Sequence, residues 1–210
     1  MKIAVVGANG KEGRLIVAEA KKAGQDVTAV VRSDDQSGAD HVLEKDLFDL
    51  MPEDVQDFDV VVDAFGAWTP ETLPQHSTSL MHLADILSGT QTRLVVVGGA
   101  GSLYVNPEHT MQLKDAPDFP EMFKPLANAM GEALEKLRGR SDVEWTYISP
   151  AADFQAEGKR TGRYSWGGEE LISNAQGKSE ISYADFAAAL VDEAVNGHHV
   201  HERISVVGEE

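Results

Sequence analysis

The opening stretch KIAVVGANGKEGRLIVAEAKKAG constrains the fold more than any other part of the sequence. The apolar residues 3–6, mostly β-branched, lead directly into a loop whose glycines fall at Gly7, Gly10 and Gly13, and a helix-forming run follows at residues 14–23. A strand that turns tightly into a helix presents the unpaired N–H groups of the helix amino terminus, which favour negatively charged ligands. We therefore expect this loop to hold phosphate groups.

The glycine spacing indicates that the phosphates belong to a dinucleotide. In a dinucleotide-binding strand–helix–strand unit, the first glycine allows the tight turn, the second lets the backbone approach the pyrophosphate, and the third permits close helix packing. The spacing here, G-x-x-G-x-x-G, differs from the G-x-G-x-x-G form, but it stands between a predicted strand and a predicted helix, as the unit requires. The predicted cofactor contacts in this loop are Gly7, Asn9, Gly10, Lys11, Glu12 and Gly13.

The residue that follows the second predicted strand, at residues 27–31, selects between the two nicotinamide dinucleotides. An acidic side chain would bond the ribose 2′-hydroxyl of NAD, but this position, about 20 residues after the glycine loop, holds Arg32. Its guanidinium can bind the 2′-phosphate of NADP through two hydrogen bonds, and Ser33 can add a hydroxyl. The alternative is a solvated loop arginine, since two aspartates follow. We predict that NADP(H) is preferred over NAD(H).

Asp46 and Leu47 lie where a third short strand is expected to end, beside the adenine pocket of this topology. A carboxylate there can accept a hydrogen bond from the adenine amino group, while the leucine packs on the ring. The alternative is that Asp46 caps a helix that begins near Leu47. Both alternatives keep the two residues as candidate cofactor contacts.

The rest of the chain alternates short apolar runs with helical patterns. The runs lack a polar alternate face, which is typical of parallel strands buried on both sides by helices. We predict an α/β fold: one domain over residues 1–210 with a doubly wound, mainly parallel sheet and helices on both faces. Two long connections, at about residues 104–121 and 151–179, are predicted to form substrate-side loops. The further strands are predicted at residues 60–64, 94–97, 145–148 and 204–207, and later helices at 126–137 and 182–197.

Composition excludes several classes of partner. A formal net charge of -17 disfavours binding to nucleic acid or to an anionic membrane surface, and no apolar run reaches the roughly 20 residues that span a bilayer. The sequence has no cysteine, and a strand that starts at Lys2 leaves no room for a signal peptide. We expect a cytoplasmic monomer or homodimer that binds a small-molecule substrate. No metal site is predicted, because His198, His199 and His201 lack ligand spacing and read as exposed turn residues.

Six segments, VGANGKEG, VVRS, VVVGGAGSLYV, WTYISPAADF, GKRTGRY and GKSEISYADFAAALVDE, together resemble the atypical short-chain dehydrogenase/reductase group. This group includes NmrA-like proteins, biliverdin reductase B and NAD(P)H-flavin reductases. The resemblance extends over essentially the whole chain. It implies a Rossmann-like sheet, a nicotinamide cofactor and a small planar acceptor, with a flavin as the leading candidate.

The nicotinamide half of the crevice is expected beyond the carboxyl ends of the later strands, as in other open α/β sheets. Glycines there suit a backbone that comes close to a ligand, although they also suit an ordinary strand-ending turn. A proline fixes a bend and leaves its neighbours' backbone groups available for the carboxamide. The predicted contacts are Ala64, Phe65, Gly66, Gly98, Gly99 and Pro150.

The sequence lacks the acid–base pair of typical short-chain dehydrogenases, a tyrosine followed four residues later by a lysine. The helix that should carry the pair reads EMFKPLANAMGEALEKLR, in which Lys124 has only Asn128 four residues on. Alcohol oxidation through an activated tyrosine is therefore not supported. The nearest counterpart of the family's active-site serine is Ser102, with Ala100 as the alternative alignment. Ser102 is the single candidate catalytic residue, acting through a polar contact.

A reaction without a protein acid fits this absence. A reduced nicotinamide can pass hydride directly to a stacked flavin such as FMN, so positioning supplies most of the catalysis. The predicted substrate pocket consists of Trp68, Tyr104 and Phe154, with Tyr164 and Trp166 as further aromatic candidates. The alternative for each aromatic residue is that it packs the core or closes a loop. A basic cluster of Lys159, Arg160 and Arg163 can meet an acceptor phosphate or carboxylate, or can form a solvated loop face. The alternative function is an NADP(H)-binding sensor or regulator without turnover, as in NmrA-like proteins.

Overall fold

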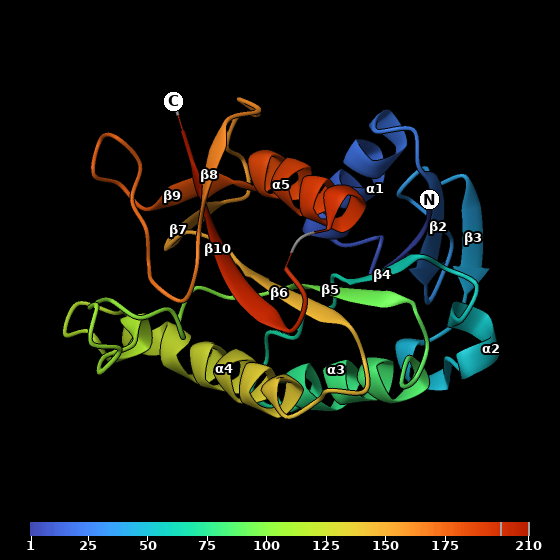
Figure 1. The fold of residues 1–210 in the computed structure, drawn as a ribbon, viewed down its shortest axis with the longest axis horizontal. Helices are drawn as coiled ribbons and strands as arrows, with labels where there is room; N and C mark the ends of the chain where they lie inside the picture. The colour runs from blue at the N-terminus through green and yellow to red at the C-terminus, as the bar shows by residue number, and fades with distance from the viewer. Residues whose placement is uncertain (198, 210) are drawn as a thin grey trace.

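The computed structural model describes residues 1–197 and 199–209. Within them the chain forms an eight-stranded sheet of order β3-β2-β1-β4-β5-β6-β10-β8 (Figure 1). All neighbouring pairs are parallel except the last, in which β8 runs antiparallel to β10 at the sheet edge. The strands are β1 Lys2–Val6, β2 Asp26–Val31, β3 His41–Glu44, β4 Val60–Asp63, β5 Arg93–Val97, β6 Trp145–Ser149, β8 Tyr164–Gly167 and β10 Glu202–Gly208, and a small parallel pair joins β7 Asp153–Gln155 to β9 Glu180–Ser182.

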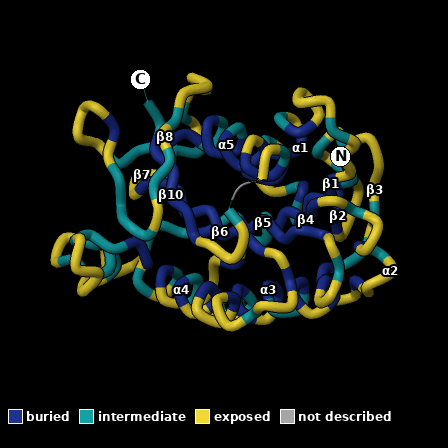
Figure 2. The backbone as a smooth tube through the Cα atoms, in the orientation of Figure 1, coloured by how far each residue is buried: buried dark blue, intermediate teal, exposed yellow. Residues whose placement is uncertain are grey.

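Helices cover both faces of the large sheet. In Figure 1, α1 and α5 lie on one face, and α3 and α4 lie on the other. Two apolar cores result, one under each helical layer, and Figure 2 shows the buried chain concentrated along the sheet and the inner sides of the helices. The helices are α1 Lys11–Lys22, α2 Pro52–Val55, α3 Gln75–Ile86, α4 Lys124–Arg138 and α5 Tyr183–Asn196, with 3-10 turns at Leu47–Asp49, Leu113–Asp115 and Glu121–Phe123.

The predicted α/β class and single-domain, Rossmann-like architecture are confirmed. The first helix begins earlier than its apolar pattern suggests, at Lys11, because the extended backbone of Gly10 precedes it directly. At α5 the predicted cap is present: the Ser182 hydroxyl accepts a hydrogen bond from the backbone N–H of Asp185 at 3.0 Å. Among the described residues, no helix is both long enough and apolar enough to cross a membrane.

The region predicted as one long loop at residues 151–179 is wrong in part. It contains β7 and the antiparallel edge strand β8. Its glycine-rich, polar composition hid β8, whose pairing with β10 is a long-range contact. Tyr164 and Trp166 of β8 lie 5.7 Å apart between ring centroids and pack against the core under α1 and α5. These two residues, which were predicted as candidates for the substrate pocket, therefore pack the edge strand β8 against the core.

A buried ion pair ties α5 to the sheet. Arg93, at the start of β5, pairs with Glu193 near the end of α5, and both side chains are almost fully buried. The guanidinium also donates to the Thr146 hydroxyl and, at 3.0 Å, to the backbone oxygen of Glu193. His199 Nδ1 lies 2.9 Å from the Glu193 carboxylate. This cluster joins α5 to the neighbouring strands β5 and β6.

Of the histidines after α5, His199 differs from the prediction of an exposed turn residue, whereas His201 is exposed in a bend before β10, as predicted. His199 is half-buried in the Arg93 cluster, and His201 Nε2 lies 2.9 Å from the backbone oxygen of Val143. His198 lies outside the described residues. Within residues 1–197 and 199–209, no group of histidine and acidic side chains could hold a metal ion.

Replacement of Glu193 by alanine should destabilise the protein strongly. The change leaves the Arg93 guanidinium buried without its carboxylate, and loss of one partner of a buried pair costs about 3–5 kcal/mol. Denaturant unfolding at neutral pH measures the free energy. Glu135→Ala is the control, since Glu135 pairs with Arg138 on the surface. Equal losses in the two variants would contradict the role of the Arg93 cluster.

Candidate functional site

A large cavity of about 1110 Å³ opens beyond the carboxyl ends of the central parallel strands. Its wall combines the β1–α1 loop, the ends of β2, β4, β5 and β6, and parts of α4 and α5. This is the position at which open α/β sheets bind ligands. Its wall includes the predicted residues Gly7, Asn9, Gly10, Lys11, Glu12, Arg32, Ser33, Asp46, Leu47, Ala64, Phe65, Gly66, Trp68, Gly98, Gly99, Ser102, Pro150 and Phe154.

The glycine loop at one end of the cavity is held by close backbone contacts. Gly7 has a φ of 78°, in the left-handed region, and a Cβ atom there would lie 2.8 Å from the backbone oxygen of Ala64. A Cβ atom on Gly13 would lie 2.3 Å from the backbone oxygen of Gly7. Gly13 therefore lets α1 approach the loop and is not part of the cavity wall. Gly13 was predicted to contact the cofactor directly, but in the structure it serves the close packing of α1 against the loop.

Asn9 connects the glycine loop to the segment after β2. Its side-chain amide donates to the backbone oxygen of Asp34 at 3.0 Å, and its Oδ1 accepts from the backbone N–H of Gln36 at 2.7 Å. These bonds fix the rim on which Arg32 and Ser33 lie exposed. Within residues 1–197 and 199–209, no hydrogen bond or ion pair occupies the Arg32 guanidinium. It is available to a ligand.

Asp46 caps a helical turn, as the second of its two predicted roles required. The third short strand is present as expected, but it ends at Glu44, two residues before Asp46. The Asp46 Oδ1 accepts from the backbone N–H of Phe48 at 2.9 Å and begins the 3-10 turn Leu47–Asp49. Asp46 and Leu47 still line the cavity, next to Phe48 and Lys45.

The cavity wall continues from the glycine loop along the segments after β4 and β5. The buried Asp63 accepts from the backbone N–H of Phe65 at 3.0 Å, and burial raises the pKa of Asp63 to about 6. The backbone N–H of Gly99 donates to the Tyr147 hydroxyl at 3.3 Å, and burial raises the pKa of Tyr147 to about 12. Tyr147 is not part of the cavity wall, so it is not a proton donor to a ligand.

Ser102 lies in the same part of the wall and is held from behind by a buried arginine. Arg203 Nη1 donates to the Ser102 hydroxyl at 3.3 Å, and Nη2 donates to the Ser102 backbone oxygen at the same distance. Arg203 itself pairs with Glu169, which Arg138 also contacts at 2.7 Å. The Ser102 oxygen therefore keeps its hydrogen atom free for a ligand while its position is fixed.

The structure shows which residues of α4 face Ser102, where typical short-chain dehydrogenases carry the tyrosine–lysine pair. The residues of α4 that face Ser102 and its neighbour Gly101 are Ala127 and Gly131, which are four residues apart. A Cβ atom on Gly101 would lie 2.5 Å from the Ala127 Cβ, and one on Gly131 would lie 3.6 Å from the Ser102 Cβ. Neither residue carries an acid–base group. The Nζ atom of Lys114, from the loop before α4, lies 3.7 Å from the position that a Cβ atom on Gly131 would occupy. Sequence reasoning missed Lys114, because nothing local predicts how that loop folds back.

The aromatic residues divide between the cavity and the rest of the fold. Phe154 lines the cavity and lies 4.1 Å from Tyr183 between ring centroids, while Trp68, at the rim, is 72% exposed. Tyr104 lies outside the cavity wall, contrary to the prediction, and stacks on His109 at 4.4 Å. Further apolar residues line the cavity that the sequence did not single out: Leu126 and Met130 follow the ordinary helical spacing of α4, and the others are placed by long-range packing. The residues concerned are Phe119, Phe123, Leu126, Met130 and Tyr183.

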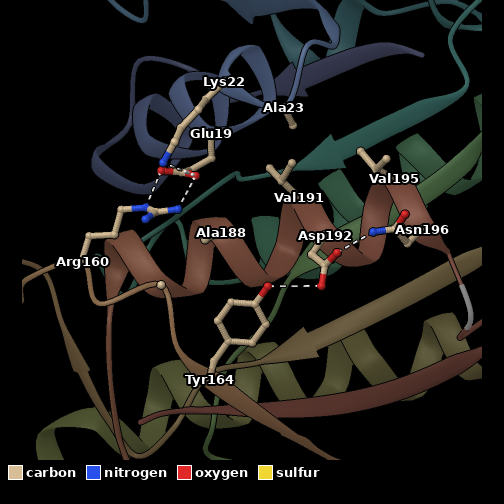
Figure 3. Close-up of a pocket in the computed structure, with 11 residues that line it drawn as sticks. Glu19, Lys22, Ala23, Arg160, Tyr164, Ala188, Val191, Asp192, Val195 and Asn196 are labelled. Carbon is tan, nitrogen blue, oxygen red and sulfur yellow. Dashed lines mark hydrogen bonds and ion pairs between the residues drawn. The ribbon is translucent and has the colours of Figure 1, made fainter. Parts of the chain in front are cut away.

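The basic cluster lies away from this cavity. Arg160 lines a smaller cavity of about 370 Å³ between α1 and α5 (Figure 3). Its guanidinium contacts the Glu19 carboxylate at 2.7 and 3.0 Å, as the dashed lines of Figure 3 show. Lys159 and Arg163 line neither cavity. The expectation that this cluster meets an acceptor phosphate is therefore not supported.

Glu12 is the unusual group of the main cavity. It lies in the first turn of α1, and its side chain is buried. Neither carboxyl oxygen has a hydrogen-bond partner among the described residues. Burial raises the pKa of Glu12 to about 9, so the carboxyl group is neutral at physiological pH.

The chain matches a known family and a relative along nearly its whole length. Residues 7–196 match the family described as NAD(P)H-binding. The chain is 47% identical over 212 residues to the uncharacterized protein YwnB of Bacillus subtilis (strain 168), and the match covers 100% of the chain and 99% of YwnB.

Solved structures show the same fold. A protein of Streptococcus pneumoniae TIGR4, named a "putative NADH-flavin reductase", is 52% identical with a TM-score of 0.97, and 99% of each chain is covered. A "putative epimerase" of Bacteroides thetaiotaomicron is 34% identical with a TM-score of 0.84, covering 100% of this chain and 97% of that one. The two names assign different activities to one fold.

Glu12→Gln should make the protein more stable than the wild type above pH 5. The unfolded chain loses the Glu12 proton near pH 4.5, whereas the folded protein keeps it up to about pH 9. Between these values, wild-type stability falls relative to the variant by about 1.4 kcal/mol per pH unit. Unfolding free energies measured from pH 5 to 9 test this. Glu53, exposed in the first turn of α2, is the matched control, and Glu53→Gln should follow the wild type. Parallel curves for Glu12→Gln and wild type would contradict the burial argument.

Proposed function

The chain belongs to the NAD(P)H-binding family, and on this premise we propose that it is an NAD(P)H-dependent reductase that passes hydride to a small planar acceptor such as a free flavin. One observation carries the proposal. A single cavity joins the glycine loop to an apolar, partly aromatic end that lacks the tyrosine–lysine pair. Such a site suits a transfer that depends on stacking and alignment.

The residues of the cavity fit a nicotinamide dinucleotide. The glycine loop offers the amino terminus of α1 to the pyrophosphate. The volume of about 1110 Å³ lies slightly above the roughly 300–1,000 Å³ common for ligand pockets, in keeping with a cofactor and an acceptor together. Phe123 and Met130, from the α4 side, give the cavity apolar surfaces on which a planar ring can stack, and Phe154 adds a further aromatic surface from β7.

The chain's own residues position the reactants. When bound, the reduced nicotinamide supplies a hydride, the oxidised flavin accepts it at N5, and water supplies the remaining proton. The backbone near Gly98 and Gly99 offers close contact to the nicotinamide. Ser102, fixed by Arg203, donates its hydroxyl hydrogen to a ligand oxygen. The apolar wall excludes water from the stacked rings, so alignment supplies most of the rate.

NADPH is proposed as the preferred donor because of Arg32. This side chain is exposed at the cavity rim, at the end of β2, and has no protein partner among the described residues. No acidic side chain occupies the position that would select NADH. Asn9 fixes the backbone on which Arg32 stands.

Arg32→Asp should raise the Kd for NADPH roughly tenfold to a hundredfold, because charge-assisted hydrogen bonds to the 2′-phosphate contribute about 1.5–3 kcal/mol. The Kd for NADH should change little. Fluorescence titration with both dinucleotides measures the two constants. Arg163→Asp, an exposed arginine outside the cavity, controls for overall charge. Equal losses for NADPH and NADH would reject Arg32 as the selector.

The reductase activity is tested by mixing the protein with NADPH and excess FMN or riboflavin under anaerobic conditions. We expect protein-dependent loss of absorbance at both the nicotinamide and flavin bands, relative to a mixture without protein. NADPH binding without turnover across flavins, quinones and a tetrapyrrole would contradict the proposal. That outcome would favour a sensor that binds NADP(H) and acts through another partner.

A further inference from the structure

We propose that the acceptor is a planar molecule without a phosphate or carboxylate group, such as riboflavin, and that the cavity discriminates against FMN. The inference rests on the proposed function and names the substrate class of the same site. The reduced nicotinamide gives a hydride, which carries two electrons, and water gives the remaining proton. Riboflavin therefore leaves as its two-electron-reduced dihydro form, and the dinucleotide leaves oxidised.

The acceptor ring is expected beside the segment that follows β5. Hydride passes directly only when the acceptor stacks on the nicotinamide, which in the proposed function lies beside Gly98 and Gly99. Helix α4 packs on the same segment. A Cβ atom on Gly99 would lie 2.9 Å from the Met130 Sδ, and one on Gly101 would lie 2.5 Å from the Ala127 Cβ. An acceptor stacked on the nicotinamide therefore meets the part of the wall that α4 and this segment form together.

This part of the wall, which we call the α4 face, has no charged side chain among its residues, all of which the structure describes. Its one polar side chain is that of Ser102, whose hydroxyl accepts from Arg203 and so keeps its hydrogen atom for a ligand. A hydroxyl donor suits a neutral carbonyl oxygen, such as those of a flavin ring. A phosphate held there without a cation would be costly to desolvate. The α4 face consists of residues 99–102, Leu113, Phe119, Phe123 and the α4 residues Leu126, Ala127, Met130 and Gly131.

The cations near the α4 face do not offer it a positive charge. Arg203, which lies behind Ser102, is already paired with Glu169. Lys114 and Lys124 come from the segments next to the face, but neither is part of the cavity wall, and Lys124 pairs with Glu121. An acceptor phosphate would therefore find no partner on this side of the cavity.

The cations that do line the cavity lie where the dinucleotide is expected. Lys11 belongs to the first turn of α1, next to the glycine loop, Arg32 follows β2, and Lys45 follows β3. Lys45 also pairs with Asp54 at 2.6 Å. The phosphates of the dinucleotide are expected to meet Lys11 and Arg32, which leaves these two cations unavailable to an acceptor.

The charge of the protein also opposes an anionic acceptor. The formal net charge is -17, and β7 adds the carboxylate of Asp153 to the cavity wall. A negatively charged surface slows the approach of an anion. Riboflavin has the same ring as FMN but lacks the phosphate, so the two flavins should differ in binding and not in the transfer itself.

The test compares riboflavin with FMN at saturating NADPH under anaerobic conditions, through initial rates of NADPH oxidation corrected for a mixture without protein. Riboflavin should show a kcat/KM roughly tenfold above that of FMN, through a lower KM and with a similar kcat. A kcat/KM for FMN equal to or above that for riboflavin would overturn the inference and leave the reductase in place. NADPH binding without turnover of either flavin would reject the proposed function, and the inference with it.

Leu126→Lys places a cation on the α4 face and should raise kcat/KM for FMN several-fold relative to riboflavin. Asn128→Lys is the matched control, because it adds the same charge to the same helix at an exposed position outside the cavity wall. Its ratio between the two flavins should stay near that of the wild type. The ratio is measured within each variant, so a loss of stability does not change it. Equal shifts of the ratio in the two variants, or no shift in Leu126→Lys, would overturn the role of the α4 face.

Discussion

The contact between Gly13 and the backbone of Gly7 sets the position of everything around the cavity. A Cβ atom on Gly13 would lie 2.3 Å from the Gly7 oxygen, so only glycine lets α1 begin this close to β1. The same approach brings Gly7 against Ala64 and so fixes the glycine loop to the end of β4. It also buries Glu12. The phosphate end of the cavity is thus a consequence of backbone packing.

The other end of the cavity is also built by close approach. α4 comes so near to Gly101 that a Cβ atom on this glycine would lie 2.5 Å from the Ala127 Cβ. The two residues of α4 at this point, Ala127 and Gly131, carry no acid–base group, while Arg203 fixes Ser102 from the core side. The proposed direct hydride transfer suits such a site, because it depends on the alignment of the two reactants more than on an acid–base group of α4. That is the physical reason for assigning it a direct hydride transfer.

Much of the fold and half of the site followed from local sequence. The β1–α1 loop, the parallel strands and the Ser182 cap are encoded by apolar runs, glycines and a capping serine that act on their neighbours. The edge strand β8, the position of Tyr104 and the placement of Lys114 depend on how long loops fold back, which no local pattern records. The pairing of Arg160 with Glu19 joins residues far apart in the sequence. The burial of Glu12 needed the packed helix, since its sequence position reads as an ordinary first-turn acid.

The central claim is that one cavity holds the dinucleotide with its nicotinamide at the β5 end, beside space for a planar acceptor. A crystal structure of the protein with NADPH tests it most directly. With NADPH bound, we expect the 2′-phosphate against Arg32, the pyrophosphate over the glycine loop, and the nicotinamide beside Gly98 and Gly99. A reversed orientation, or NADPH bound in the groove between α1 and α5, would contradict it.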